Sequence, residues 1–332
     1  MILHPSVIAL LIGSALTGFL LLSAATYGIT VIRKWDMGSG SEEQLGLERR
    51  TYLISTMVSY AFGFQLLSLF LFVYTADELC PLFTGAMCAA GTLNVNAYGY
   101  PTLLLKITNF FLAAVWLVVN FVDNKAPDYP QIRKKYVLLL LCTPTILAEA
   151  ALQFLYFLRL NPDVITSCCG SLFSAEAQDA GTAMASISGL PLRYPFFILM
   201  GLTLAAALLV FRRKGAGAGF YAVLCAAAFV VSLLAVISVF SLYYYELPTH
   251  HCPFCLLKSD YGYAGYPLYI VLFGGTAAGL GTGAIAPFAK SPSLAEIVPL
   301  VQRKLALASF IGYAIFTALI LVKLMTSSLT LD

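Results

Sequence analysis

The chain contains eight apolar segments, each about as long as a helix must be to cross a lipid bilayer. The hydrocarbon core of a bilayer is about 30 Å thick, so a spanning helix needs roughly 20 predominantly apolar residues. Of the 332 residues, 60% are apolar and only 11% are charged, whereas soluble domains carry about 25% charged residues. The sequence therefore predicts an all-α polytopic membrane bundle of about eight transmembrane helices, over residues 5–32, 51–75, 101–122, 136–160, 194–211, 219–244, 267–288 and 305–327.

The connections between these segments predict a single integral membrane domain over residues 1–332. None has room for a nucleotide-binding domain, and none carries a Gly-rich phosphate loop. Three connections end in a tyrosine–proline step, at Pro101, Pro195 and Pro267. Such a step is either an ordinary helix start at the membrane interface or a sign of internal repetition. Repetition would give helical hairpins at about 51–122, 136–211 and 219–288, framed by helices 5–32 and 305–327.

The net charge of +3 is less informative than the placement of the basic residues. Fourteen of the 19 Lys and Arg residues lie in alternate connections or at their edges, and the positive-inside rule makes those connections cytoplasmic. Both termini and the other connections are then expected in an oxidising space, such as the periplasm outside a bacterial inner membrane. Because segment 5–32 has no small-residue cleavage site after a short apolar core, we expect a retained helix there.

Six of the eight cysteines lie in the three outer connections. Cys80 and Cys88 are in the first, the adjacent pair Cys168-Cys169 is in the second, and Cys252 and Cys255 are in the third. Paired thiols at one membrane face indicate redox or soft-metal chemistry, provided that the three connections fold together. The other two cysteines, Cys142 and Cys225, lie inside apolar segments and are expected to be small buried hydrophobic residues.

The pair Cys252-Pro-Phe-Cys255 is the most specific of these signals. A C-x-x-C pair holds two sulfurs close together, and a nearby cation or helix N-terminus lowers the pKa of the first thiol. Lys258, His250 and His251 are candidate cations. The pair is expected to be redox-active, to bind a metal together with the histidines, or to form an inert disulfide.

The other two pairs leave similar alternatives open. Cys80 and Cys88 can relay electrons to a second pair by thiol–disulfide exchange, or they can form a structural disulfide. Met87 adds a thioether that suits Cu(I). Adjacent cysteines bridge each other only through a strained ring, so Cys168 and Cys169 are expected to bond elsewhere or to bind a soft metal.

Two ionisable residues lie inside predicted spans. Glu149 is expected to be a protonated hydrogen-bonding acid, a proton carrier or the partner of Lys106, because an isolated charge is costly there. Lys106 can alternatively extend its ammonium group outward to the interface. Four amide side chains in the spans can form interhelical hydrogen bonds, namely Gln65, Asn109, Asn120 and Gln153.

Two stretches resemble known membrane redox enzymes. Cys80-x7-Cys88, followed by Gly91-Thr92-Leu93-Asn94 and Tyr98-Gly99-Tyr100-Pro101, resembles the loop-cysteine segment of the vitamin K epoxide reductase family. The later C-x-x-C resembles the active site of that family, and Cys-Pro-Phe-Cys-Leu-Leu-Lys is similar to a motif of bacterial quinone-linked disulfide-forming enzymes. The resemblance implies that Cys252 exchanges with the loop pair and that Cys255 faces a quinone. It also implies that Lys258 and Tyr266 line the quinone site.

Three functions are consistent with these features. The first is a membrane thiol–disulfide oxidoreductase that passes electrons between the two cysteine pairs and a membrane quinone. The second is a protein for binding, delivery or transport of copper or another soft metal, with ligands drawn from His250, His251, Cys168, Cys169 and Met87. The third is a disulfide-stabilised subunit of a larger membrane complex. The expected partners are the lipid bilayer and a periplasmic thiol or metal-carrying protein, with no nucleic acid.

Overall fold

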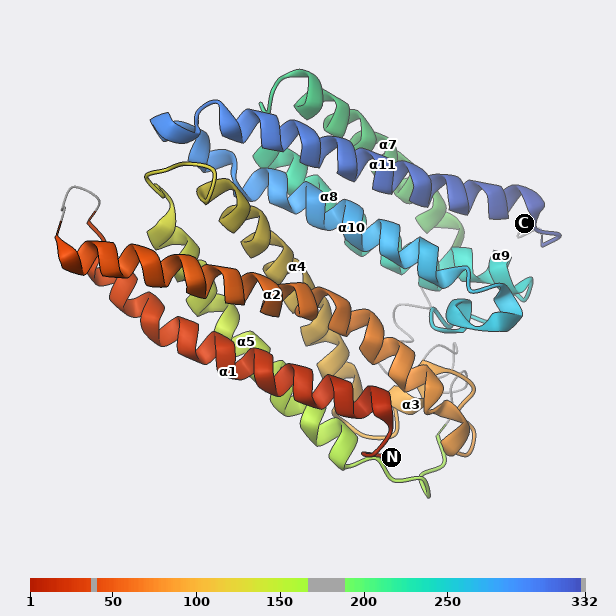
Figure 1. Ribbon diagram of the computed structural model, residues 1–332. Coiled ribbons are helices and arrows are strands. Elements are labelled where there is room, and N and C mark those ends of the chain that lie inside the picture. The colour runs from red at the N-terminus through yellow and green to blue at the C-terminus, as the bar shows by residue number, and fades with distance from the viewer. Residues whose placement is uncertain (37–40, 167–188, 330–332) are drawn as a thin grey trace. The chain divides into compact units, whose positions relative to one another are not determined.

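A computed structural model of the chain describes residues 1–36, 41–166 and 189–329. Within these ranges eight helices are long and apolar enough to cross a membrane, which confirms the all-α fold and the integral membrane character. They are α1 Pro5–Lys34, α2 Glu42–Glu78, α4 Gly99–Asp123, α5 Ile132–Leu158, α7 Gly189–Arg212, α8 Ala218–Ala235, α10 Gly265–Ala284 and α11 Ile297–Thr326 (Figure 1).

Several helices extend beyond the predicted apolar segments. α2 begins at Glu42 and ends at Glu78, whereas its predicted span is 51–75. The apolar pattern marks only the part of a helix that crosses the hydrocarbon, and the hydrogen-bonded ladder continues into polar residues on either side. Acidic residues such as Glu42 and Glu43 in the first turn of α2 also interact favourably with the positive end of the helix dipole.

Two of the three tyrosine–proline steps open a helix as predicted, and the third does not. Pro101 and Pro267 lie in the first turns of α4 and α10. Pro195 instead lies inside α7, so the prediction that this helix starts at 194 is wrong. Proline has no backbone N–H, so one hydrogen bond in the second turn of α7 is lost, but the helix continues through it.

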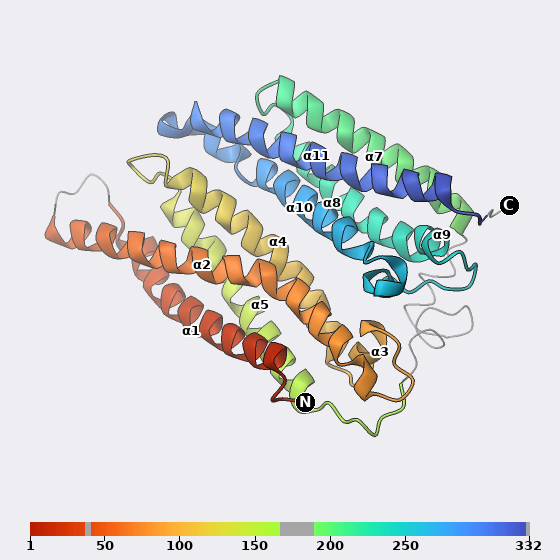
Figure 2. The same ribbon diagram turned by 45° about the vertical axis from the view of Figure 1, so that its right-hand side comes forward.

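The helices belong to two compact units. Unit 1 consists of residues 1–75, 95–161 and 287–299. In it α1, α2, α4 and α5 run side by side, and α5 packs against both α1 and α4 (Figures 1 and 2). Its core contains Trp116, whose ring lies edge-on to that of Phe62 at 5.0 Å. Gly28 lets Tyr136 approach α1, since a Cβ atom there would lie 2.7 Å from the tyrosine ring.

Unit 2 consists of residues 76–94, 162–286 and 300–332. Its long helices are α7, α8, α10 and α11, with α8 packed against α7 and α10. Gly275 of α10 and Gly312 of α11 allow a close helix–helix approach, since a Cβ on Gly312 would lie 2.9 Å from the Gly275 Cα. Cys225 of unit 2 and Cys142 of unit 1 are both fully buried, as predicted.

The helical run that begins with α8 contains an irregularity near its end. A π-helical turn, Val236–Phe240, separates α8 from the short helix α9, Ser241–Tyr245. A π-turn inserts one residue into the ladder and leaves carbonyl groups available to other donors. The chain then passes through residues 246–264, which carry Cys252 and Cys255, before α10 begins.

Candidate functional site

The first cysteine loop, residues 79–98, contains two short helical segments. The 3₁₀ turn η1, Cys80–Leu82, follows the end of α2, and the short helix α3, Ala89–Leu93, begins directly after Cys88. The backbone N–H of Ala89 donates to Oδ1 of Asp77 at 3.1 Å, so a side chain at the end of α2 fixes the residue next to Cys88. Cys88 itself has an extended backbone and precedes the first residue of α3.

Thr166, which belongs to the described part of the second loop, donates two hydrogen bonds to the first loop. Its backbone N–H donates to the Thr84 carbonyl at 3.0 Å, and its hydroxyl donates to the Gly91 carbonyl at 2.9 Å. Gly85 makes this approach possible, because its φ is +86° and a Cβ atom there would overlap the Thr166 carbonyl oxygen. The predicted meeting of the outer loops is therefore seen between the first loop and Thr166.

Two tyrosine hydroxyls hold the backbone of the C-x-x-C segment. Tyr245, the last residue of α9, donates to the Cys252 carbonyl, and Tyr269 of α10 donates to the Pro253 carbonyl at 2.8 Å. Cys255 then opens the 3₁₀ turn η3, Cys255–Leu257. The motif is thus fixed by the ends of two membrane-spanning helical runs and lies where those runs leave the predicted bilayer.

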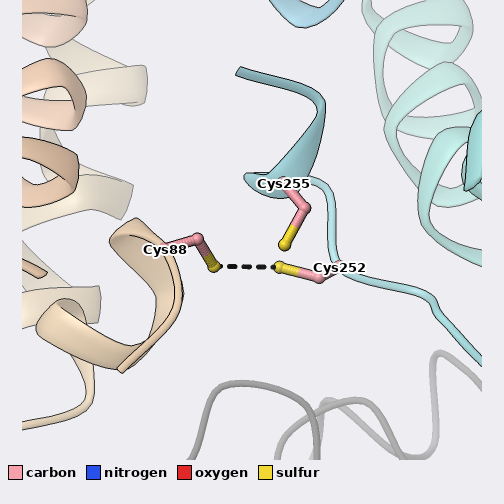
Figure 3. Close-up of side chains that lie close together, drawn as sticks. All are labelled: Cys88, Cys252 and Cys255. Atoms are coloured by element: carbon pink, nitrogen blue, oxygen red, sulfur yellow. Dashed lines mark hydrogen bonds between the residues drawn. The ribbon is translucent and has the colours of Figure 1, made fainter. Parts of the chain in front are cut away.

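Cys88, Cys252 and Cys255 form a compact group, called the thiol cluster below (Figure 3). The Sγ atoms of Cys88 and Cys252 are 3.5 Å apart, and all three Sγ atoms lie within 4.8 Å of one another. All three residues belong to unit 2 and all are buried. The two cysteine pairs that the sequence separates by more than 160 positions therefore come into direct contact.

The thiol cluster favours the thiolate form of Cys252. Hydrogen bonds from Cys255 and then from Cys88 lower the pKa of Cys252 well below that of an ordinary thiol, and they outweigh the opposing effect of burial. A lowered pKa makes a cysteine a better nucleophile near neutral pH and a better leaving group in disulfide exchange.

Lys258 lies against the other cysteine of the first loop. Its Nζ atom is 3.3 Å from Cys80 Sγ and 3.1 Å from an Asp77 carboxylate oxygen. Burial lowers the pKa of Lys258, but hydrogen bonding and charge attraction from Asp77, with a smaller contribution from Cys80, raise it overall. The residue that the resemblance assigns to a quinone oxygen thus contacts Cys80. Tyr266, assigned to the same site, is half-buried, with its ring 6.2 Å from that of Tyr263.

His250, His251 and Met87, which the sequence predicts as additional metal ligands, do not belong to the thiol cluster. The His250 ring packs edge-on against Tyr245 at 4.4 Å, and His251 Nδ1 is 3.1 Å from the Ile237 carbonyl in the π-helical turn. The Met87 side chain is 72% exposed. Among the described residues, the group that could hold a metal ion comprises the three cysteines of the thiol cluster and includes neither histidine. Cys168 and Cys169 lie outside the described residues.

Glu149 and Lys106 form an ion pair deep in unit 1. Lys106 Nζ is 2.7 Å from Glu149 Oε1, and the two side chains are 1% exposed or less. The other carboxylate oxygen accepts hydrogen bonds from Gln65 and, at 2.6 Å, from Asn109. Of the interpretations that the sequence allows, the structure selects the Glu149–Lys106 pair, and the alternative in which Lys106 reaches the interface is wrong. A wholly buried ammonium gains more from a carboxylate partner than from a distant interface.

A cavity of about 430 Å³ is found in unit 1, well separated in sequence from the cysteine loops. Asn120 lines it and donates to Ser59 at 3.0 Å, and Lys125 lies at its edge. No cysteine contributes to this cavity. A quinone pocket beside Cys255 therefore stays a prediction.

Sequence reasoning misses four residues that shape the site, namely Asp77, Tyr245, Tyr269 and Thr166. Asp77 stands three positions before Cys80, and an acidic residue so near the end of an apolar span is a signal that could have identified it. The two tyrosines look like ordinary interfacial aromatic residues until their hydroxyl partners are known.

Comparison of the chain with protein-family models, with curated proteins and with solved structures finds no match. The site must therefore be interpreted from its own chemistry.

Proposed function

We propose that this chain is a membrane thiol–disulfide oxidoreductase that passes electrons between a periplasmic cysteine pair, Cys80 and Cys88, and a membrane quinone, by way of Cys252 and Cys255. One observation carries the proposal, which is the 3.5 Å separation of the Cys88 and Cys252 sulfurs. Thiol–disulfide exchange needs a thiolate within reach of a disulfide sulfur. A buried contact between the two pairs supplies that geometry without a diffusing carrier.

The exchange balances within the protein. Cys88 attacks Cys252 of a Cys252–Cys255 disulfide, the Cys88–Cys252 bond forms, and Cys255 leaves as a thiolate that accepts the proton lost by Cys88. Cys80 then attacks Cys88 and releases Cys252, which is protonated in turn. Two electrons and two protons have moved, leaving a Cys80–Cys88 disulfide and a reduced Cys252/Cys255 pair.

The electrostatics of the thiol cluster support this order of events. Cys252 is the leaving group in the second exchange, and exchange is faster when the leaving thiol has a lower pKa. The hydrogen bonds that lower the pKa of Cys252 come from its two exchange partners, Cys255 and Cys88. When Cys252 leaves, Cys88 is bonded to Cys80 and has no S–H to donate, so the hydrogen bond from Cys255 is the one that stabilises the departing thiolate.

A quinone is the acceptor class that best suits the location of the C-x-x-C pair. Reoxidation of the pair requires an acceptor for two electrons and two protons, and quinone-to-quinol reduction takes both. Tyr245 and Tyr269 hold the backbone of the motif near the ends of membrane-spanning helices, so we expect a molecule dissolved in the bilayer to reach it. The sequence resemblance to vitamin K epoxide reductases and quinone-linked disulfide-forming enzymes points to the same acceptor.

Single cysteine-to-serine variants test the proposal in purified protein supplied with a dithiol donor and a soluble quinone. C88S, C252S and C255S should each abolish quinone reduction, because each removes an atom that forms or breaks a bond. C142S and C225S are matched controls, since both cysteines are buried inside helices and neither belongs to the thiol cluster, and they should retain turnover. Normal turnover by C255S or C88S would refute the relay.

A second candidate, binding or delivery of a soft metal, is favoured by the spacing of the thiol cluster. Three thiolates within 4.8 Å of one another can surround one Cu(I) ion. If this is the function, reduced protein should bind one copper ion with loss of binding in C88S, while H250A and H251A should bind normally. Turnover with a quinone should then be absent. Copper retention that depends on the histidines would contradict this ligand set.

A further inference from the structure

The ion pair between Lys258 and Asp77 lies beside both cysteine pairs of unit 2. Lys258 stands three residues after Cys255, and its backbone N–H donates to the Cys255 carbonyl at 3.0 Å. Its side chain reaches the first loop, where Nζ lies 3.3 Å from Cys80 Sγ and 3.1 Å from Asp77. Asp77 in turn accepts a hydrogen bond from Ala89, the residue after Cys88. Neither the relay between Cys88 and Cys252 nor a quinone site uses these contacts.

We propose that Lys258 stabilises the Cys80 thiolate that resolves the Cys88–Cys252 mixed disulfide, and that Asp77 positions Lys258 for this step. The inference rests on the proposed function and deepens it by assigning each loop cysteine a different task. Cys88 makes the bond to the C-x-x-C pair, and Cys80 breaks it. Lys258 is then a catalytic residue because it touches a reacting sulfur, and Asp77 is a positioning residue.

The chemistry of resolution explains why Cys80 needs a cation. In this step the Cys80 thiolate forms a bond to Cys88 Sγ, the Cys88–Cys252 bond breaks, and the electron pair leaves on Cys252. Only the thiolate of Cys80 is nucleophilic, and Cys80 is 4% exposed, so water offers its charge little stabilisation. An ammonium group in contact with the sulfur stabilises the anion directly. Lys258 keeps its proton throughout, and the proton lost by Cys80 ultimately appears on Cys252.

Each of the two carboxylate oxygens of Asp77 makes a different contact. Oδ2 contacts Lys258 and Oδ1 accepts from Ala89, so one carboxylate fixes both the cation and the start of α3. Burial raises the pKa of the Cys80 thiol, and the charges of Asp77 and Cys88 raise it further, whereas the hydrogen bond and charge of Lys258 lower it. Lys258, in contact with the Cys80 sulfur, is thus the group that favours the Cys80 anion.

The first experiment measures how quickly the mixed disulfide disappears. Reduced protein is mixed with a stoichiometric oxidant of the C-x-x-C pair, quenched with acid and alkylated, and the Cys88–Cys252 species is quantified by mass spectrometry. K258M should slow its disappearance by about 10- to 100-fold, the range that corresponds to loss of a charge-assisted hydrogen bond. K258R should restore most of the rate, since it keeps the charge, and D77N should show a smaller effect in the direction of K258M.

K323M is the matched control. Lys323 belongs to the same unit, its side chain is 26% exposed against 25% for Lys258, and it lies 3.4 Å from the Glu246 carboxylate. K323M should leave the mixed disulfide at its wild-type level. Equal resolution rates in K258M and wild type, or failure of K258R to restore the rate of a well-folded K258M protein, would overturn the inference.

A second measurement separates failure of this inference from failure of the proposed function. Reduced protein is treated with methyl methanethiosulfonate, and modification of the Cys80 peptide is followed by mass spectrometry without any quinone. Cys80 should react more slowly in K258M and recover in K258R. If Cys80 reactivity depends on Lys258 while wild type reduces no quinone, the proposed function fails and the role of Lys258 stands. If wild type turns over and Cys80 reacts equally in all variants, the role of Lys258 is wrong.

Discussion

Removing one partner of the Lys106–Glu149 pair should destabilise the protein far more than removing both. In K106M the Glu149 carboxylate keeps its hydrogen bonds from Gln65 and Asn109 but loses the ammonium 2.7 Å away. Breaking a buried pair in this way typically costs about 3–5 kcal/mol, because an uncompensated charge remains in a medium of low dielectric constant. We expect the same range for K106M, since both side chains are 1% exposed or less.

The double variant K106M/E149Q should recover much of this loss. A glutamine carbonyl oxygen can still accept from Gln65 or Asn109, so no charge is left unpaired and most of the polar contacts survive. We expect the double variant to be more stable than K106M by about 2 kcal/mol or more. S68A is a useful reference, because it removes no charge but only two hydrogen bonds, one from Lys106 at 3.2 Å and one to the Gln65 carbonyl at 3.0 Å, and it should cost about 0.5–1.5 kcal/mol for each.

Unfolding of purified protein in mixed micelles, titrated with a denaturing detergent and followed by circular dichroism, measures these differences. The result that would refute the reasoning is additivity, in which the losses of K106M and E149Q simply sum in the double variant. Additivity would mean that the two side chains do not interact in the folded protein.

Two further predictions concern the cysteine loops. Gly85→Ala should loosen the contact with Thr166, because alanine disfavours a φ of +86° and its Cβ would overlap the Thr166 carbonyl. We expect the free energy of unfolding to fall by roughly 1–3 kcal/mol and the first loop to be proteolysed faster. Unchanged proteolysis would count against that contact. Because the folded-state pKa of Cys252 is lowered, its thiolate contributes stability that is fully present above the unfolded-state thiol pKa and is lost as pH falls through the folded-state pKa. Alkylation of Cys252 in reduced protein should accordingly persist to lower pH than alkylation of an unfolded control, and coincident pH profiles would contradict the assignment.

The sequence is sufficient to predict the helices because crossing a bilayer requires a long apolar run. The polar ends of the helices carry no apolar signal, so the sequence does not predict that α2 extends well past its apolar segment. The predicted helix start at Pro195 is wrong because a tyrosine–proline step does not by itself show whether a helix begins there or continues through it.

Which residues take part in the site could be predicted better than how they are arranged. The C-x-x-C motif and the loop cysteines stand out by their spacing, but the Cys88–Cys252 contact joins positions that are 164 residues apart. No local sequence pattern predicts a contact between positions so far apart. Likewise, the sequence identifies Lys258 as a cation near Cys255. Its contacts with Cys80 and with Asp77, at the end of α2, join positions far apart in the chain, so no local pattern predicts them.

The π-helical turn Val236–Phe240 makes the C-x-x-C loop sensitive to the length of the helix before it. A π-turn amounts to one additional residue in a helix, and here the Ile237 carbonyl within the turn lies 3.1 Å from His251, the neighbour of Cys252. In a regular helix that carbonyl would be used by the backbone four residues later. We expect deletion of one residue in this stretch to leave the transmembrane segment intact while removing the contact between Ile237 and His251. The length of this buried helix end and the position of the loop that carries Cys252 and Cys255 are therefore linked.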